Sequence, residues 1–386
     1  MKIKFENIFL ISLFSYPFFA GLSLFLNMNS SYFSLSRYIL IIFSIIFLIK
    51  NIRFKFYNEF IPIIFFLFYL SYLIYFNYSD LLFLTFLISI LLPCFLIYFI
   101  KFEIKNINYE YISYVLIFFI FFYILSYLYI LSDEDVFKYI YLNSLNDELT
   151  LRGFRVGTLN LNPISLCMYC VVCYIFIGFS KVKFKLFFEF CLLMIIINTG
   201  SKGPFLSFII STLVLIIFRN NNLKKTLIRF LILTVIATIL TKSLIDQRND
   251  IIGRIYNIYD KSYNDYALEQ RIEAYKKYLL NTEKKETKEI SEVTNNSFHN
   301  IFLEANYLDF KFLIFMMIFF TYYFRNLYIK LNFQNSLIPL QHLFILFFIQ
   351  SLFSGFLPRE EFLFIFLALL ASKNKFIVKK LQSDLK

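Results

Sequence analysis

Long apolar runs and short polar connections alternate along nearly the whole chain of 386 residues. Such runs, with few charges, predict membrane-spanning helices, because about 20 residues rising about 1.5 Å each cross roughly 30 Å of hydrocarbon. We therefore expect an all-α, polytopic integral membrane protein with about 12 transmembrane helices. The expected spans are residues 5–26, 33–49, 60–76, 81–100, 111–131, 159–179, 184–198, 204–218, 227–245, 307–324, 337–353 and 361–371.

Two connections between the spans are long. The whole chain, 1–386, is expected to form a single membrane domain with loops at 132–158 and 246–306. Within the longer loop, which joins helices 9 and 10, apolar residues spaced i, i+4, i+7 and i+11 predict an amphipathic helix over about 264–280. These residues are Leu268, Ile272, Tyr275 and Leu279.

The connections alternate in charge, and this gives the chain an orientation. Every second connection carries a cluster of Lys and Arg, such as Lys181, Lys183 and Lys185, whereas the connections between these clusters, leaving out the long loop 246–306, hold few. Basic residues that flank membrane spans stay on the cytoplasmic side. Both termini are therefore expected in the cytoplasm, and both long loops on the outer side.

Composition agrees with a membrane protein. The chain is 59% hydrophobic and 22% aromatic, with a mean hydropathy of +0.68, whereas soluble domains are about 45–50% apolar. The net charge of +12 would suggest nucleic acid as partner of a soluble protein. Because the basic residues here flank apolar runs, we expect membrane lipids as partners and no nucleic acid.

The cysteines predict packing rather than a metal centre. Cys167, Cys170 and Cys173 share one face of an apolar run and have no fourth ligand nearby. A free cysteine in such a place behaves as a small buried hydrophobe. With only two histidines in the chain, we expect no metal and no cofactor.

The stretch "NTGSKGPFLSF" predicts a turn that opens a helix on the outer side. Thr199 or Ser201 can cap this helix, and Pro204 suits its first turn. The helix start offers free N–H groups and partial positive charge, and Lys202 adds a full charge beside them. The turn is therefore a candidate phosphate site. The alternative is a plain capped turn whose lysine meets lipid headgroups.

Five arginines on the outer side are further candidate anion ligands. Arg152 and Arg155, in "RGFRVGTLNLNP", can clamp an anion with two guanidiniums; the alternative is that they anchor the helix end. Arg271 projects from the amphipathic loop helix, where the alternative is a solvated face. Arg248 and Arg254 follow the ninth span and can equally contact headgroups.

His299 is a candidate general base, because imidazole exchanges a proton near neutral pH. Asn300, Glu304 and Glu360 are candidates for orienting a ligand; for Glu360 the alternative is a favourable position at a helix start. The other histidine, His342, lies within an apolar run beside Gln341 and predicts packing or hydrogen bonding. The cations and the base on one outer side suit transfer from a lipid diphosphate to an acceptor that loses a proton.

From about Arg152 onward, the chain resembles the bacterial O-antigen ligase and polymerase superfamily. Four pieces carry the resemblance in order: "RVGTLNLNP", "TGSKGPFLSF", "EQRIEAYKKYL" and "HNIFLEANYLDF". They resemble the family's Arg-x-Gly…Asn-Pro helix start, its Ser-Arg-Gly turn, its arginine-bearing loop helix and its His-Asn/Ser…Leu-Glu motif. Two departures are Lys202, where arginine is usual, and Asp309 with Phe310, where a glycine is expected.

The resemblance implies a multi-pass glycosyltransferase of the bacterial inner membrane with a large periplasmic loop between helices 9 and 10. It implies metal-independent transfer of a glycan from undecaprenyl diphosphate, with His299 as base and Arg155, Lys202 and Arg271 on the diphosphate. We favour an O-antigen polymerase that joins undecaprenyl-diphosphate-linked oligosaccharides, with a chain-length regulator protein as a further candidate partner. The alternatives are a ligase that transfers the glycan to lipid A-core, and a lipid-linked sugar flippase.

Overall fold

The computed structural model describes helical segments that make up less than half of the chain. The described residues are 4–14, 42, 46, 61–77, 83, 87, 107–132, 163–199, 201–219, 221–242, 309–318, 321 and 338–354. Nearly all of them are helical. Within these ranges, no helix combines the length and the apolar character that crossing a membrane requires.

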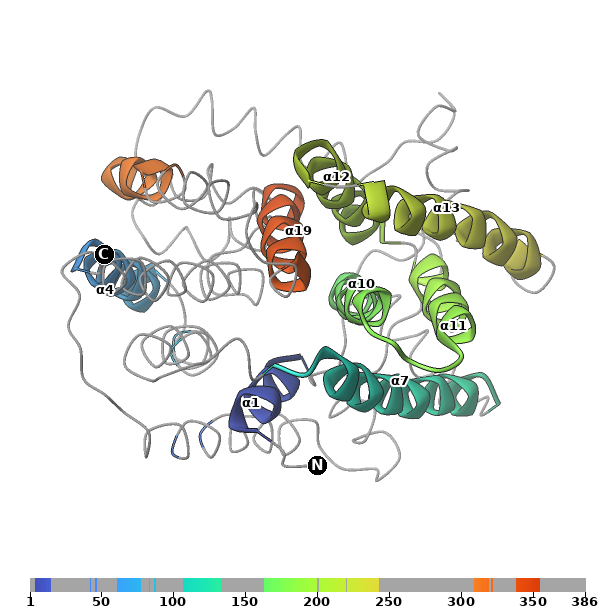
Figure 1. The fold of residues 1–386 in the computed structure, drawn as a ribbon. Helices are drawn as coiled ribbons and strands as arrows, with labels where there is room; N and C mark the ends of the chain where they lie inside the picture. Colours follow the sequence, from blue (N-terminus) through green and yellow to red (C-terminus); the bar gives the residue numbers. More distant parts are fainter. Residues whose placement is uncertain are drawn as a thin grey trace, which may run out of the picture. The chain divides into compact units, whose positions relative to one another are not determined.

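The chain divides into two compact units. The first, Met1–Ser44 with Asn106–Tyr266, contains α1 (Phe5–Phe14), α7 (Tyr109–Ser132), α10 (Pro163–Phe179), α11 (Lys185–Asn198), α12 (Lys202–Arg219) and α13 (Asn221–Lys242) (Figure 1). The second, Ile45–Lys105 with Ala267–Lys386, contains α4 (Ile61–Asn77), α19 (Ile338–Ser354) and helical residues 310–318.

The apolar runs predicted most of these helices to within a few residues. The clearest difference is α13, which begins at Asn221 and not near residue 227. Its first turns, "NNLKKT", are polar, so hydropathy does not detect them, although lysine and leucine favour helix. The additional turns carry Lys224 and Lys225, which are exposed.

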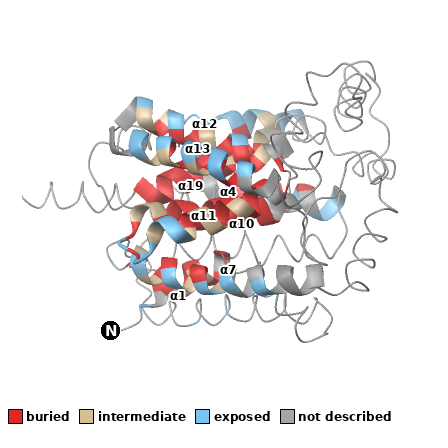
Figure 2. Ribbon diagram, turned by 90° about the vertical axis from the view of Figure 1, so that its right-hand side faces the viewer, coloured by how far each residue is buried: buried red, intermediate tan, exposed pale blue. Residues whose placement is uncertain are grey.

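The centre of the first unit is α10. It packs against α7, α11 and α12, and α13 packs in turn against α11 and α12. Residues along α10 are buried almost without interruption, whereas α12 and α13 also present exposed residues (Figure 2). A helix that is hydrophobic all round is expected at the centre of a bundle.

Two contacts fix the direction of α12 relative to α10. The Sγ of Cys167 lies 3.9 Å from the carbonyl oxygen of Ser201, 34 residues further along the chain. The rings of Tyr174 and Phe208, with the same separation in sequence, have centroids 5.5 Å apart. Because both pairs share one offset, α10 and α12 run parallel and in register.

The direction of α13 is opposite. The ring of Tyr174 lies 5.2 Å from that of Phe230. Further along α10, a Cβ at Gly178 would lie 3.9 Å from the γ-methyl of Thr226, which comes earlier in α13. The bundle therefore has two distinct ends. One holds the 199–201 turn with the starts of α10 and α12, and the other holds the 180–184 corner with the starts of α11 and α13.

Two asparagine side chains join α1 to the start of α7. The N–H of Tyr111 donates to the side-chain oxygen of Asn108 at 3.0 Å, which caps α7. The N–H of Asn108 itself donates to the side-chain oxygen of Asn7 at 2.8 Å. Further along α1, the ring of Phe14 packs edge-on against Phe176 of α10 at 5.6 Å. These contacts hold α1 and α7 on one side of α10.

Candidate functional site

The turn between α11 and α12 is buried and closes α11. The hydroxyl of Thr199 donates to the carbonyl of Ile196 at 2.7 Å, and that of Ser201 donates to the carbonyl of Thr199 at 3.4 Å. Both donated bonds point back to α11, while the Thr199 hydroxyl also accepts a hydrogen bond from the N–H of Ser201 at 3.3 Å. The cap on α12 that the sequence predicts stays a prediction. The short turn leaves the last carbonyls of α11 needing partners. Pro204 lies in the first turn of α12, as predicted.

Lys202 is the first residue of α12, and Pro163 is the first residue of α10. The contact between Cys167 and Ser201 brings these two helix starts together. Each start presents backbone N–H groups without a partner inside its own helix and a partial positive charge. The segment with Arg152 and Arg155 leads directly into Pro163. The described residues therefore place the start of α12, with Lys202, beside the start of α10.

The three cysteines of α10 are buried, as the packing interpretation predicted. They are Cys167, Cys170 and Cys173. In the described part of the chain, no group of three or more His, Cys, Asp or Glu side chains is placed to hold a metal ion. The role of Cys167 is to seat the 199–201 turn on α10, through its contact with the Ser201 carbonyl.

Asp309 lies near the start of the tenth expected span, at a position where the resemblance described above predicts a glycine. Its carboxylate accepts a hydrogen bond from the N–H of Lys311 at 2.8 Å, and its carbonyl accepts one from the N–H of Leu313 at 3.1 Å. Asp309 is thus the N-cap of helical residues 310–318, and aspartate is among the best residues for that position. The helix begins at residue 310, whereas the sequence predicted a span from 307.

The same aspartate ties this helix to α4 within the second unit. The hydroxyl of Tyr69 donates a hydrogen bond to the Asp309 carboxylate. The ring of Tyr69 packs edge-on against Phe312 and Phe315, with centroids 5.8 Å and 6.3 Å away. Asp309 therefore fixes the start of helical residues 310–318 against α4.

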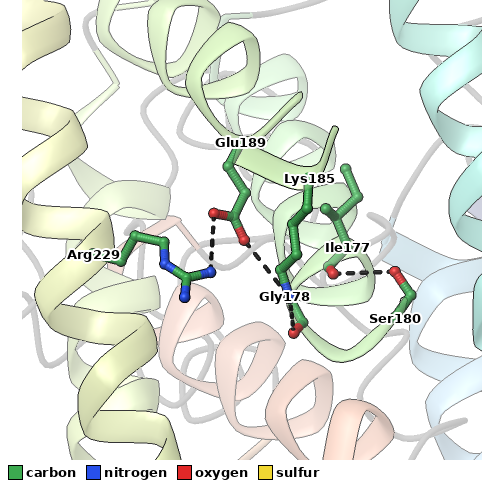
Figure 3. Close-up of polar contacts among 6 residues, drawn as sticks. All are labelled: Ile177, Gly178, Ser180, Lys185, Glu189 and Arg229. Atoms are coloured by element: carbon green, nitrogen blue, oxygen red, sulfur yellow. Dashed lines mark hydrogen bonds and ion pairs between the residues drawn. The ribbon is translucent and has the colours of Figure 1, made fainter. Parts of the chain in front are cut away.

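A charged cluster lies at the opposite end of the first unit. The sequence motifs did not predict it. Glu189 of α11 is fully buried, 3.5 Å from a terminal nitrogen of Arg229 and 4.0 Å from the ammonium of Lys185. The Lys185 ammonium also donates to the carbonyl of Gly178 (Figure 3). One signal was present in the sequence: a single acid within an apolar run needs a partner, and such residues are functional candidates.

Several predicted residues lie outside the described part of the chain. They are Arg152, Arg155, Arg248, Arg254, Arg271, His299, Asn300, Glu304 and Glu360. The same holds for residues 133–158, the loop 246–306 with its predicted helix over 264–280, and the expected span 361–371. His342 is described, and it is buried in α19 beside the buried Gln341, in line with a packing role.

Comparison of the chain with protein-family models, with curated proteins and with solved structures found no match. What the protein does must therefore be inferred from its own residues.

Proposed function

We propose that this protein is a membrane glycosyltransferase that polymerises a surface polysaccharide of the O-antigen type. It would join oligosaccharide repeats carried on undecaprenyl diphosphate at the periplasmic face. The observation that carries the proposal is the pairing of two helix starts, those of α10 and α12, through Cys167 and Ser201. This pairing supports the convergence of Arg155 and Lys202 that the sequence motifs predict.

The paired helix starts suit a diphosphate. Two sets of N–H groups without a partner inside their own helices, and the charge of Lys202, favour a phosphate-bearing ligand at this end. In the transfer, the acceptor hydroxyl oxygen bonds to the anomeric carbon of the donor sugar while the bond from that carbon to the diphosphate breaks. The bonding electrons leave with the lipid diphosphate. We assign the acceptor proton to His299 and the negative charge of the leaving group to Arg155, Lys202 and Arg271.

Two exposed apolar stripes support a location in lipid. Both follow the helical spacing i, i+4, i+7 and i+11, one on α12 and one on the neighbouring α13. The stripes are Leu206, Ile210, Leu213 and Ile217 on α12, and Ile228, Ile232, Val235 and Ile239 on α13. Soluble monomers rarely expose contiguous apolar surface on this scale, whereas lipid tails would cover it.

The test replaces His299 with alanine and examines the lipopolysaccharide ladder of cells that depend on this protein. Loss of a general base slows a reaction by roughly 10²–10⁴-fold, so we expect core that carries a single repeat and no ladder. The matched control is His342→Gln at the other histidine, which is buried in α19. The control should keep the ladder, provided that immunoblotting shows equal amounts of both variants in the membrane.

The other outcomes separate the alternatives. Bare core with accumulating lipid-linked polymer would identify a ligase, which uses the same donor chemistry but a lipid A-core acceptor. Lipid-linked repeats trapped on the cytoplasmic side would identify a flippase. An unchanged ladder in the His299→Ala strain would rule out His299 as the base.

A further inference from the structure

A second charged region lies at the end of the first unit opposite the 199–201 turn, and the proposed transfer does not use it. Here the 180–184 corner meets the start of α13, since Gly178 is next to Thr226. The cations of this end form what we call the basic corner: Lys181, Lys183, Lys185, Lys224, Lys225 and Arg229. In the two sequence segments concerned, 178–189 and 221–229, Glu189 is the only acid.

Glu189 organises the inner edge of the basic corner. Its buried carboxylate is flanked by Arg229 of α13 and Lys185 of α11, as Figure 3 shows. One carboxylate cannot neutralise two cations, so the cluster keeps a net positive charge. The guanidinium has five N–H donors, and its side chain is 41% exposed while Glu189 is 0% exposed. The part of Arg229 that faces away from Glu189 can therefore reach a ligand at the surface.

The remaining lysines of the basic corner, Lys181, Lys183, Lys224 and Lys225, are all exposed. Beside them, the corner exposes large apolar side chains. Phe184 is 80% exposed, and Leu186 and Phe187 are 58% and 62% exposed. An aqueous anion would account for the lysines but leave these three side chains in water. A lipid headgroup accounts for both, since its phosphate faces the cations while its acyl chains cover the apolar side chains.

The backbone at Phe184 sets up this arrangement. Phe184 has φ 56° and ψ 29°, a left-handed conformation that bulky residues rarely adopt. The N–H of Lys183 contacts the hydroxyl of Tyr114 on α7 at 3.5 Å, and Val182 is buried. These anchors hold the corner so that the side chain of Phe184 points outward, between the lysines and the start of α11.

We propose that the basic corner is a binding site for an anionic phospholipid of the cytoplasmic leaflet. The phosphate of the headgroup lies against the lysines and the outward side of Arg229, and Phe184, Leu186 and Phe187 contact the acyl chains. Glu189 is a positioning residue that holds Arg229 and Lys185 at this edge. The inference rests on the membrane location in the proposed function, and it places a lipid site at the end of α10 away from the transfer reaction.

The experiment uses the full chain in nanodiscs that contain equal amounts of phosphatidylglycerol and phosphatidylcholine. Native mass spectrometry then counts the lipids that stay bound after release. The test variant is Lys181→Gln with Lys183→Gln. The control is Lys138→Gln with Lys311→Gln, which removes the same charge from two lysines that are not among the residues of the basic corner. Because each lysine near an anionic surface contributes roughly a fivefold effect on binding, the loss of two lysines should lower retained phosphatidylglycerol roughly 25-fold in the test variant only.

The contrary results are equally specific. Equal retention of phosphatidylglycerol in the two double variants would overturn the lipid site. Release of phosphatidylglycerol by excess inorganic phosphate would also overturn it, because it would indicate a site for free anions. If the first variant fails to fold, Lys224→Gln with Lys225→Gln tests the same corner from α13. Lipid retention does not depend on polymerisation, and the His299→Ala protein should keep it. Failure of the lipid site and failure of the glycosyltransferase proposal are therefore distinguishable.

Discussion

Glu189 and Arg229 face each other across the α11–α13 interface at 3.5 Å, with the carboxylate fully buried and the guanidinium partly exposed. The separation is at the long limit for a hydrogen bond, so charge carries most of the attraction. The two partners are therefore unequal. Removal of the arginine leaves a buried acid whose remaining ion-pair partner among the described residues is Lys185. Removal of the acid leaves two cations that can reach solvent.

This asymmetry predicts the order of two variants. Arg229→Met keeps the apolar stem but strands the carboxylate, and we expect it to lower the free energy of unfolding by about 3 kcal/mol. Glu189→Gln should cost only about 1 kcal/mol, because the remaining charges are screened. Thermal unfolding of the full chain in detergent measures both. Glu110→Gln, at an exposed acid in the first turn of α7, is the control, and the reverse order of the two variants would contradict the account.

The pair formed by Tyr69 and Asp309 gives a prediction for the second unit. Tyr69→Phe removes one hydrogen bond to a carboxylate and should lower the free energy of unfolding by about 1.5 kcal/mol. Asp309→Ala removes that bond and the helix cap, so its cost should be about 1 kcal/mol larger. In a double-mutant cycle, Tyr69→Phe should cost little once Asp309 is alanine. Additive costs would mean that the two side chains do not interact.

Asp309→Gly tests the departure from the family pattern directly. Glycine costs an N-cap only a few tenths of a kcal/mol relative to aspartate, so most of the loss in this variant should come from the bond to Tyr69. The variant should therefore resemble Tyr69→Phe in thermal unfolding. A loss as large as that of Asp309→Ala would mean that capping dominates at this position.

Cys167 offers a way to move the 199–201 turn without touching a charged residue. Leucine at this position is too large for the contact with the Ser201 carbonyl, and overpacking costs about 1–3 kcal/mol. Cys167→Leu should also push apart the starts of α10 and α12. We therefore expect the rate of the proposed polymerisation to fall by more than the loss of folded protein alone would cause. Cys173→Leu, at another buried cysteine of α10, is the matched control. Equal rates in the two variants at equal protein levels would argue against a site at the paired helix starts.

Long apolar runs made the helices readable from the sequence. α7, α11 and α19 lie where hydropathy predicted them because each is apolar through almost its whole length. Hydropathy did not predict the polar contacts between helices, because each such contact depends on a partner from elsewhere in the chain. Glu189 of α11 forms an ion pair with Arg229 of α13, which lies forty residues further along the chain. Because α12 separates these two helices in the sequence, no local sequence pattern specifies the pair.

The sequence predicted only part of the candidate site, because its polar contacts also depend on the rest of the fold. The sequence predicted a helix opening at "TGSKGP", and α12 begins at Lys202. It did not predict that both hydroxyls donate to a carbonyl behind them, or that the Thr199 hydroxyl accepts from the N–H of Ser201. Local preference allows either use of a hydroxyl. The choice depends on how tightly the turn is buried against α10, and that burial is a property of the folded bundle.

The parallel, in-register alignment of α10 and α12 has an electrostatic consequence. Helices that lie side by side in antiparallel fashion attract each other through their dipoles, but parallel neighbours bring like poles together. Here both positive poles lie at the 199–201 turn, where α11 ends and its negative pole offsets part of the repulsion between them. An anion bound there relieves the repulsion, and by mass action it stabilises the folded state as it binds. Occupancy of this end and the cohesion of the helix bundle are therefore thermodynamically linked.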